Sequence, residues 1–198
     1  MPDISHPSKP QFAKVRELCL ASLLLFSLAA CSSLPQKVLL NVPHKIQTGS
    51  LLCVPTSASM VLAYYGQYEA PYYLKDLAGH SKNFSGTYYS DLVAGLRKIG
   101  FHWKMKGYSL DHAGFERGLN EIRRDLADNR PVLISTSMPP IGHTMVVIGY
   151  DDDERTVSLM DPAKLDPGLR ILSFEKLEEI WHDDYQHNDR WLLVTWPK

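Results

Sequence analysis

The chain has 198 residues, of which 44% are hydrophobic and 22% are charged, and its formal net charge is −1. This length allows a targeting segment and one domain with a sizeable core, and the composition is that of a globular protein rather than a disordered one. Basic residues form no block beyond pairs such as Arg123 and Arg124, so the concentrated positive surface that nucleic-acid binding requires is not predicted.

Residues 1–30 predict a secretory signal peptide rather than a part of the fold. Basic residues precede a mostly apolar run at 18–30. The run is too short to span a bilayer as a stable helix, and its order of basic, apolar and small residues is typical of an export signal. We therefore expect a signal peptide at 1–30, a tether at 31–37 and a single domain at 38–198.

The signal ends in Leu-Ala-Ala-Cys at 28–31, which resembles a bacterial lipobox. That resemblance implies cleavage before Cys31, diacylation of the new terminus through its thiol, and a membrane partner for the mature chain. Ser32, rather than an aspartate, at the next position resembles lipoproteins sorted to the outer membrane. The expected location is the bacterial envelope, facing the periplasm. The alternative is a plain signal peptide with a chance cysteine at its end.

Cysteine usage directs attention to one residue of the domain. Cys19 lies in the predicted signal and Cys31 would carry lipid, so Cys53 is the remaining thiol. Exported proteins usually use cysteines in pairs because their compartment is oxidising. An unpaired thiol there therefore favours a chemical role, and the alternative is a small buried hydrophobic residue.

The first half of the domain predicts mainly helices. Apolar residues recur at helical spacing in four segments; Gly66 and Gly100 end two of them, and Asp111 can cap the last. In chain order, we expect a strand at 38–42, helices at 53–65, 72–78 and 92–99, a strand at 101–108, and a helix after Asp111 with Phe115, Leu119, Ile122 and Leu126 on its buried face.

The second half predicts mainly strands, because short apolar runs with β-branched residues alternate with turn signals. The expected elements are strands at 131–136, 143–150, 156–160 and 169–172, a helix at 173–181 and a final strand at 191–196. Helices first and a largely antiparallel sheet afterwards indicate an α+β domain. The acidic run at 151–154 lacks the glycine and distal glutamate of a calcium loop, so a solvated hairpin turn is predicted there and no metal site.

Cys53 stands where a thiolate is favoured. It opens the helix predicted at 53–65, so it meets unsatisfied backbone N–H groups and the positive end of the helix dipole. Pro55 fits the first helical turn, where its missing N–H has no cost. A nucleophilic thiol also requires a base that takes its proton and later protonates the leaving amine.

Three more residues complete a candidate site. His143 starts an otherwise apolar strand, where a polar ring is hard to explain by packing, although a satisfied core histidine is the alternative. Asp161 ends the next strand, so in a hairpin its carboxylate can lie beside His143 and fix the ring tautomer; its alternative role is an Asp-Pro turn. Gln47 can supply a side-chain N–H to a developing oxyanion, with the backbone N–H of Cys53 as a second donor.

The segments 47–66 and 143–162 resemble the papain-like peptidases that process double-glycine bacteriocin leaders, and more closely their stand-alone, transporter-free relatives. The shared features are Gln-x5-Cys-x-Pro at 47–55, the segments 60–66 and 143–150, Arg-Pro-Val at 130–132 before a strand, and Asp-Pro at 161–162. The resemblance implies a papain-like fold whose nucleophile helix packs on the C-terminal sheet. It implies Cys53 as nucleophile, His143 as base, Asp161 as its orienting acceptor and Gln47 as oxyanion donor.

One position departs from the family pattern. The family commonly has glycine after the cysteine, whereas this chain has Val54, whose Cβ is expected to crowd the substrate groove or to restrict which substrate residues approach. No P-loop follows, so leader cleavage coupled to export is not encoded in this chain. The function predicted is a lipid-anchored cysteine hydrolase that cleaves a peptide or isopeptide bond without a cofactor. The alternatives are an acyltransferase of the transglutaminase kind with the same triad, and a non-catalytic peptide-binding module.

Overall fold

The structure is a computed structural model that describes residues 33–79, 86–138, 142–182 and 189–198. The chain divides into two units, Met1–Ser33 and Leu34–Lys198, and the second of these is the folded domain. The predicted signal peptide, the lipobox and Cys31 lie outside the described residues.

The domain contains every helix and strand that the sequence predicts, with ends shifted by a few residues. The largest shifts are at the first strand, which is shorter than expected, and at the helix predicted from 92, which begins at Tyr89. In chain order the elements are β1 (Lys37–Leu39), α2 (Cys53–Tyr64), α3 (Pro71–Ala78), α4 (Tyr89–Lys98), β2 (Phe101–Tyr108), α5 (His112–Ala127), β3 (Val132–Thr136), β4 (His143–Asp151), β5 (Thr156–Met160), β6 (Leu169–Ser173), α6 (Phe174–Ile180) and β7 (Arg190–Pro197).

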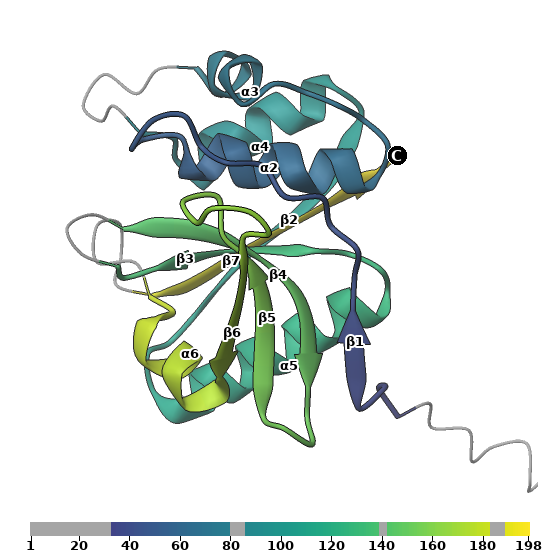
Figure 1. Ribbon diagram of the computed structural model, residues 1–198, viewed down its shortest axis with the longest axis vertical. Coiled ribbons are helices and arrows are strands. Elements are labelled where there is room, and N and C mark those ends of the chain that lie inside the picture. Colours follow the sequence, from purple (N-terminus) through teal and green to yellow (C-terminus); the bar gives the residue numbers. More distant parts are fainter. Residues whose placement is uncertain (1–32, 80–85, 139–141, 183–188) are drawn as a thin grey trace, which may run out of the picture. The chain divides into compact units, whose positions relative to one another are not determined.

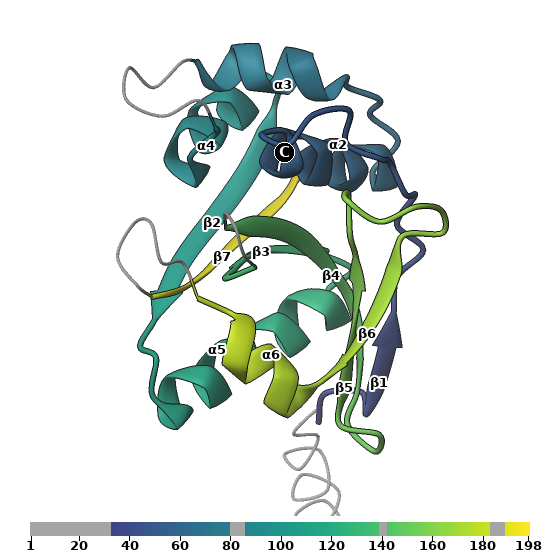
Figure 2. The same ribbon diagram turned by 60° about the vertical axis from the view of Figure 1, so that its left-hand side comes forward.

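The strands form one antiparallel sheet in the order β2-β7-β3-β4-β5-β6, and β1 pairs with the far end of β4. Helices α2, α3 and α4 lie together on one side of this sheet, and α5 and α6 lie together on the other (Figures 1 and 2). The α+β class and the packing of the helical part on a C-terminal antiparallel sheet are confirmed.

Helix α2 is buried on almost all of its faces, from Val54 to Ala63, because α3 covers one side and the sheet covers the other. The buried residues of α2 include Thr56, Ser57 and Ser59 as well as the apolar ones. Gly66 ends it with φ of +81°, a backbone conformation that glycine adopts without strain. Ser57 on α2 donates a hydrogen bond of 3.1 Å to the main-chain oxygen of Thr144 on β4. This contact fixes the start of α2 against the start of β4.

Strands β4 and β5 form a hairpin whose turn is the acidic run at 151–154. The Asp151 carboxylate accepts from the Glu154 N–H at 3.1 Å and pairs with Lys37 at 2.6 Å, as expected for a solvated turn. The register shifts by one residue beside Gly149. A Cβ at Gly149 would lie 2.4 Å from the Val38 carbonyl oxygen, so only glycine allows β1 to approach β4 this closely.

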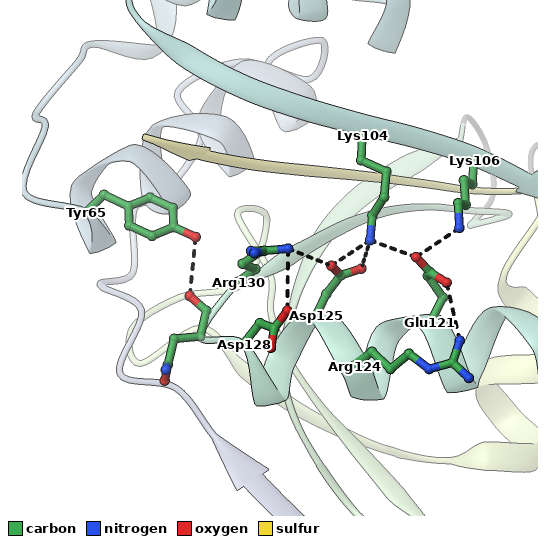
Figure 3. A network of polar contacts seen from close by, with 9 residues as sticks. Tyr65, Lys104, Lys106, Glu121, Arg124, Asp125, Asp128 and Arg130 are labelled. Carbon is green, nitrogen blue, oxygen red and sulfur yellow. Dashed lines mark hydrogen bonds and ion pairs between the residues drawn. The ribbon is translucent and has the colours of Figure 1, made fainter. Parts of the chain in front are cut away.

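An ion-pair network holds α5 against β2 (Figure 3). Lys104 on β2 donates to Glu121 at 2.7 Å and to Asp125 at 2.6 Å, and Asp125 is only 2% exposed. Arg130 lies 3.9 Å from Asp125, and the neighbouring Asn129 carbonyl accepts from Tyr65 at the end of α2. Because a buried carboxylate is costly without a charged partner, Lys104 fixes the position of α5, and the turn after α5 is tied to α2.

The domain's contacts begin slightly before the predicted boundary at 38. The Pro35 carbonyl accepts from the Tyr150 hydroxyl, and the Gln36 carbonyl accepts from the Asp152 N–H at 2.9 Å. Thus the last residues of the expected tether lie along β4. Within the described part of the chain, no helix combines the length and the apolar character that crossing a bilayer requires.

Candidate active site

Cys53 is the first residue of α2, and no side chain caps that helix end. The N–H groups of the first turn therefore face the thiol without a side-chain competitor, and they carry the positive end of the helix dipole. Cys53 is partly exposed and forms no disulfide. The backbone at the start of α2 thus contributes to the stabilisation of a thiolate at Cys53.

His143 lies at the first position of β4, and its side chain is 12% exposed. Its Nε2 lies 2.7 Å from Oδ1 of Asp161, the residue that directly follows β5. Its main-chain oxygen accepts from Thr136 at 3.0 Å, which fixes the strand start against β3. With Nε2 bound to the carboxylate, Nδ1 is the ring nitrogen left for the Cys53 thiol, to which the ring is hydrogen-bonded.

Asp161 has no solvent exposure, and every oxygen of its carboxylate has a partner. Oδ1 accepts from the Ala163 N–H at 2.8 Å in addition to His143, and Oδ2 accepts from Nε of Arg170 on β6. Its main-chain oxygen lies 3.0 Å from Nε2 of His44. The carboxylate is therefore held in one orientation. Its contact with His143 is the one that the β4–β5 hairpin predicts.

The three groups shift one another's pKa values. Burial acts to raise the pKa of Cys53, but the hydrogen bond and charge of His143, with main-chain N–H groups of Thr144 and Val54, outweigh burial and lower it. Burial acts to lower the pKa of His143, but Asp161 and Cys53 raise it to about 9. Burial acts to raise the pKa of Asp161, yet His143, Arg170 and the Ala163 N–H keep it well below its usual range.

These directions define a pH window for a thiolate–imidazolium pair. The thiolate is present above the lowered pKa of Cys53, and the imidazolium is present below about pH 9, where His143 loses its proton. Between these limits both charged forms coexist, and Asp161 stays ionised throughout because its pKa lies lower still. The activated thiolate form of Cys53 is therefore expected in a range that extends from its lowered pKa up to about pH 9.

Gln47 lies on the loop before α2, and this loop is fixed to the loop after β5. The Gln47 N–H donates to the Pro162 carbonyl at 2.8 Å, and its side-chain Nε2 donates to the Gly49 carbonyl at 3.1 Å. The side-chain oxygen is buried and has no hydrogen-bond partner among the described residues. One N–H of the Nε2 group remains for another acceptor, since an amide nitrogen carries two.

The structure corrects the expectation for Val54. Its side chain is 8% exposed and belongs to the hydrophobic core beneath α2. A side chain that packs into the core does not crowd a substrate groove, so the departure from the family pattern is a packing feature.

Sequence reasoning missed two residues beside Asp161. His44 and Arg170 come from segments far apart in the chain, and both contact Asp161. A weak signal for Arg170 exists, because it is a lone charge in a short apolar strand. Within the described ranges no group of three His, Cys, Asp or Glu side chains is arranged to hold a metal ion.

The pKa of Cys53 gives a direct prediction. We expect the rate of Cys53 alkylation by iodoacetamide to rise with pH at an inflection at least about one unit below the free-thiol value of roughly 8.5. His143→Ala should move the inflection upward, because it removes the hydrogen bond and charge that favour the thiolate. Mass spectrometry of samples quenched at successive times, read at the peptide that contains Cys53, measures the rate. An unshifted inflection that ignores residue 143 would show that the two side chains are not coupled.

Comparison with known proteins identifies the family and the fold. The model of the Peptidase_C39 like family matches residues 39–188, most of the chain. No curated protein sequence matches. Among solved structures, a protein described as a C39-like peptidase from Bacillus anthracis has a TM-score of 0.62 at 21% identity, covering 82% of this chain and 98% of its own.

Two further structures share the fold. A double-glycine-motif protease from a transporter, solved with its leader peptide, has a TM-score of 0.59 at 20% identity, covering 81% of this chain and 95% of its own. Xylellain, a cysteine protease from Xylella fastidiosa, has a TM-score of 0.57 at 14% identity, covering 98% and 94%. At these identities the likeness shows the fold, while the family match covers nearly the whole domain. The chain therefore belongs to the Peptidase_C39 like family and is a papain-fold cysteine peptidase.

Proposed function

We propose that the protein is a lipid-anchored hydrolase of the bacterial envelope that cleaves a peptide or isopeptide bond through Cys53, His143 and Asp161. The observation that carries the proposal is the continuous line of contacts from the helix-start thiol to the imidazole and from Nε2 to the buried carboxylate at 2.7 Å. Nucleophile, base and orienting acceptor stand in the order that thiol catalysis requires.

The chemistry follows from the geometry. The Cys53 thiolate attacks the carbonyl carbon, and the resulting oxyanion accepts hydrogen bonds from the Cys53 N–H and from Nε2 of Gln47. The tetrahedral intermediate collapses as His143 gives its proton to the leaving amine, which leaves an acyl thioester on Cys53. His143 then takes a proton from water, the resulting hydroxide attacks the thioester, and the acid product and free thiol are released. Asp161 keeps Nδ1 directed at Cys53 in both steps.

The substrate class proposed is a peptide or protein. A peptide is supported by the related transporter protease that was solved with its leader peptide bound. The thioester can be resolved by water or by an amine, and the Cys53–His143 pair serves both reactions. The proposal commits to water because the chain belongs to a family of peptidases, which hydrolyse the bonds that they cleave.

The deciding experiment traps the thioester. The detergent-solubilised protein is mixed with peptides from a bacterial envelope digest, quenched in acid and analysed for acyl groups on Cys53, with Cys53→Ala as control. We expect a peptidyl adduct on wild-type Cys53 alone and, without the quench, a new free carboxyl terminus. Adding glycine methyl ester separates the reactions: an amide product would indicate acyl transfer. The absence of any adduct and of any cleaved peptide would favour the non-catalytic binding module.

The proposed anchor gives a separate prediction. Because Cys31 follows a lipobox-like tetrapeptide, the mature protein should partition with membranes, and Cys31→Ser should release or mis-process it. One acyl chain gives only marginal binding, so stable attachment also predicts more than one chain on the terminus. Membrane fractionation and mass spectrometry of the mature N-terminus measure this. Soluble, unmodified wild-type protein would exclude the lipid anchor but leave the peptidase proposal intact.

A further inference from the structure

Arg170 on β6 forms the second side-chain contact of the Asp161 carboxylate. Its Nε donates to Oδ2, while Oδ1 is shared by His143 at 2.7 Å and by the Ala163 N–H at 2.8 Å. The Arg170 side chain is 35% exposed, and that of Asp161 is fully buried. An arginine thus reaches in from an edge strand to the far oxygen of the carboxylate on which His143 depends.

We propose that Arg170 is a positioning residue that acts through Asp161: it fixes the carboxylate plane and keeps the group ionised, so that the imidazole presents Nδ1 to Cys53. This inference rests on the proposed function, since it assigns a role within that site.

The strand register makes this contact a built feature of the fold. Arg170 on β6 is the register partner of Leu159 on β5. Leu159 lies two residues before Asp161, which directly follows β5. The Asp161 N–H donates to the Gly168 carbonyl at 2.9 Å, which closes the loop between the two strands. Because side chains two apart on a strand share a face, Arg170 is brought to the side of the sheet from which Asp161 projects.

Fixing both oxygens restricts rotation of the carboxylate. With Oδ1 alone bound, the group could turn about its Cβ–Cγ bond and weaken the contact with Nε2 of His143. An N–H donor on Oδ2 opposes that rotation, and hydrogen bonds between charged partners are the strong ones. Since Asp161 has no solvent exposure, loss of Arg170 would also leave Oδ2 buried without a charged partner, which favours the protonated acid.

Other charged groups near Asp161 do not replace Arg170. His44 lies 3.0 Å from the Asp161 main-chain oxygen, not from its carboxylate, and its other nitrogen faces Asp166 at 3.7 Å. Lys164 directs its amine to the Leu169 carbonyl at 2.5 Å. From α2, Cys53 reaches Asp161 only through the His143 ring. Among the described residues, Arg170 and His143 are therefore the cationic side chains that contact the Asp161 carboxylate.

The test compares Arg170→Met, which removes charge and donor, with Arg170→Lys, which keeps the charge. Arg155→Met is the matched control, because Arg155 forms an exposed pair with Glu175 at 2.8 Å at the far end of β5. Two probes are used on the full chain in detergent: alkylation by iodoacetamide and acylation by p-nitrophenyl acetate, each against pH. Circular dichroism and thermal melting verify folding, and Arg170→Gln substitutes for the methionine variant if that variant does not fold.

We expect Arg170→Met to slow acylation by roughly tenfold to a hundredfold, the range typical of residues that orient a functional ligand. In both pH profiles, the inflection at which the rate falls on the acid side (the acid limb) should move up by about one pH unit or more. The reason is that Asp161 then becomes protonated within the pH range of the assay. Arg170→Lys should recover most of the limb position, and Arg155→Met should match wild type. An acid limb that does not move in Arg170→Met or Arg170→Gln would overturn the proposal.

A double variant tests whether the effect passes through Asp161. If it does, Arg170→Met should add little to Asp161→Asn in rate and nothing in limb position, because linked residues are non-additive. An equal additional loss in the Asp161→Asn background would contradict the role. Wild-type protein whose Cys53 shows no lowered inflection and no acylation would contradict the proposed function instead, so the two failures are distinct.

Discussion

Cys53→Ala should abolish turnover of any peptide that the wild-type protein cleaves, and His143→Ala should be nearly as severe. The thiolate forms the covalent bond, and without the imidazole neither the thiol nor the leaving amine has a proton partner. Because such members act as a unit, either single loss costs about as much as both. Asp161→Asn should leave more residual activity, since the thiol and base remain. Single-turnover rates on a cleaved peptide measure all three.

His112→Ala is the matched control for the histidine. His112 is 73% exposed and pairs with Glu178 at 3.0 Å on the surface, so its loss removes an imidazole without touching the site. It should retain wild-type rates and melting temperature. Turnover in Cys53→Ala would assign the reaction to another nucleophile, and turnover in His143→Ala at a wild-type rate would remove the base from the mechanism.

Gln47→Ala should lower kcat by roughly 10²–10³ with little change in KM, as expected when one oxyanion donor is lost. The loop that carries Gln47 is fixed without its side chain: the Gln47 N–H is bound by Pro162, and Lys45 donates to Ser59 at 2.6 Å. Removing the amide should therefore leave the backbone in place. The loss should appear in kcat, because the oxyanion develops in the transition state and the tetrahedral intermediate and is absent from the bound substrate.

Gln67→Ala provides the comparison, since Gln67 donates to Glu69 at 3.1 Å in the segment after α2. Its rate should be that of wild type. A Gln47→Ala enzyme with normal kcat would reassign Gln47 to loop packing, to which its 3.1 Å bond with Gly49 already contributes. Gln47→Glu distinguishes the two roles further, because it keeps the size of the side chain but replaces the N–H donor with an acceptor.

The sequence predicted the class of fold and the contact between His143 and Asp161 because both depend on element ends. A helix start, a strand start and a strand end place three residues through backbone geometry alone, and hairpin pairing then brings two strand ends together. Burial of the α5 face could be read the same way, since Phe115, Leu119, Ile122 and Leu126 follow the helical period.

Features that depend on the paths of loops could not be predicted from the sequence. Which side chain meets Oδ2 of Asp161 is decided by the path of residues 162–168 and the register of β5 with β6, neither of which has a local signal. The same reason explains the wrong expectation for Val54: the pattern places it beside the nucleophile, but the rotation of α2 turns it into the core. The first strand is shorter than predicted because regular pairing with β4 ends at Leu39.

The loops that carry Gln47 and Asp161 are joined by the hydrogen bond to Pro162 and by His44, although more than half of the chain separates them in synthesis. An emerging chain that ends before β4 contains Cys53 but lacks both His143 and Asp161. Such a chain has no activated nucleophile, so it cannot attack its neighbours or the export machinery. If residues 1–30 are the proposed export signal and the chain crosses the membrane unfolded, reactivity begins only after arrival, when the last strands have joined the sheet.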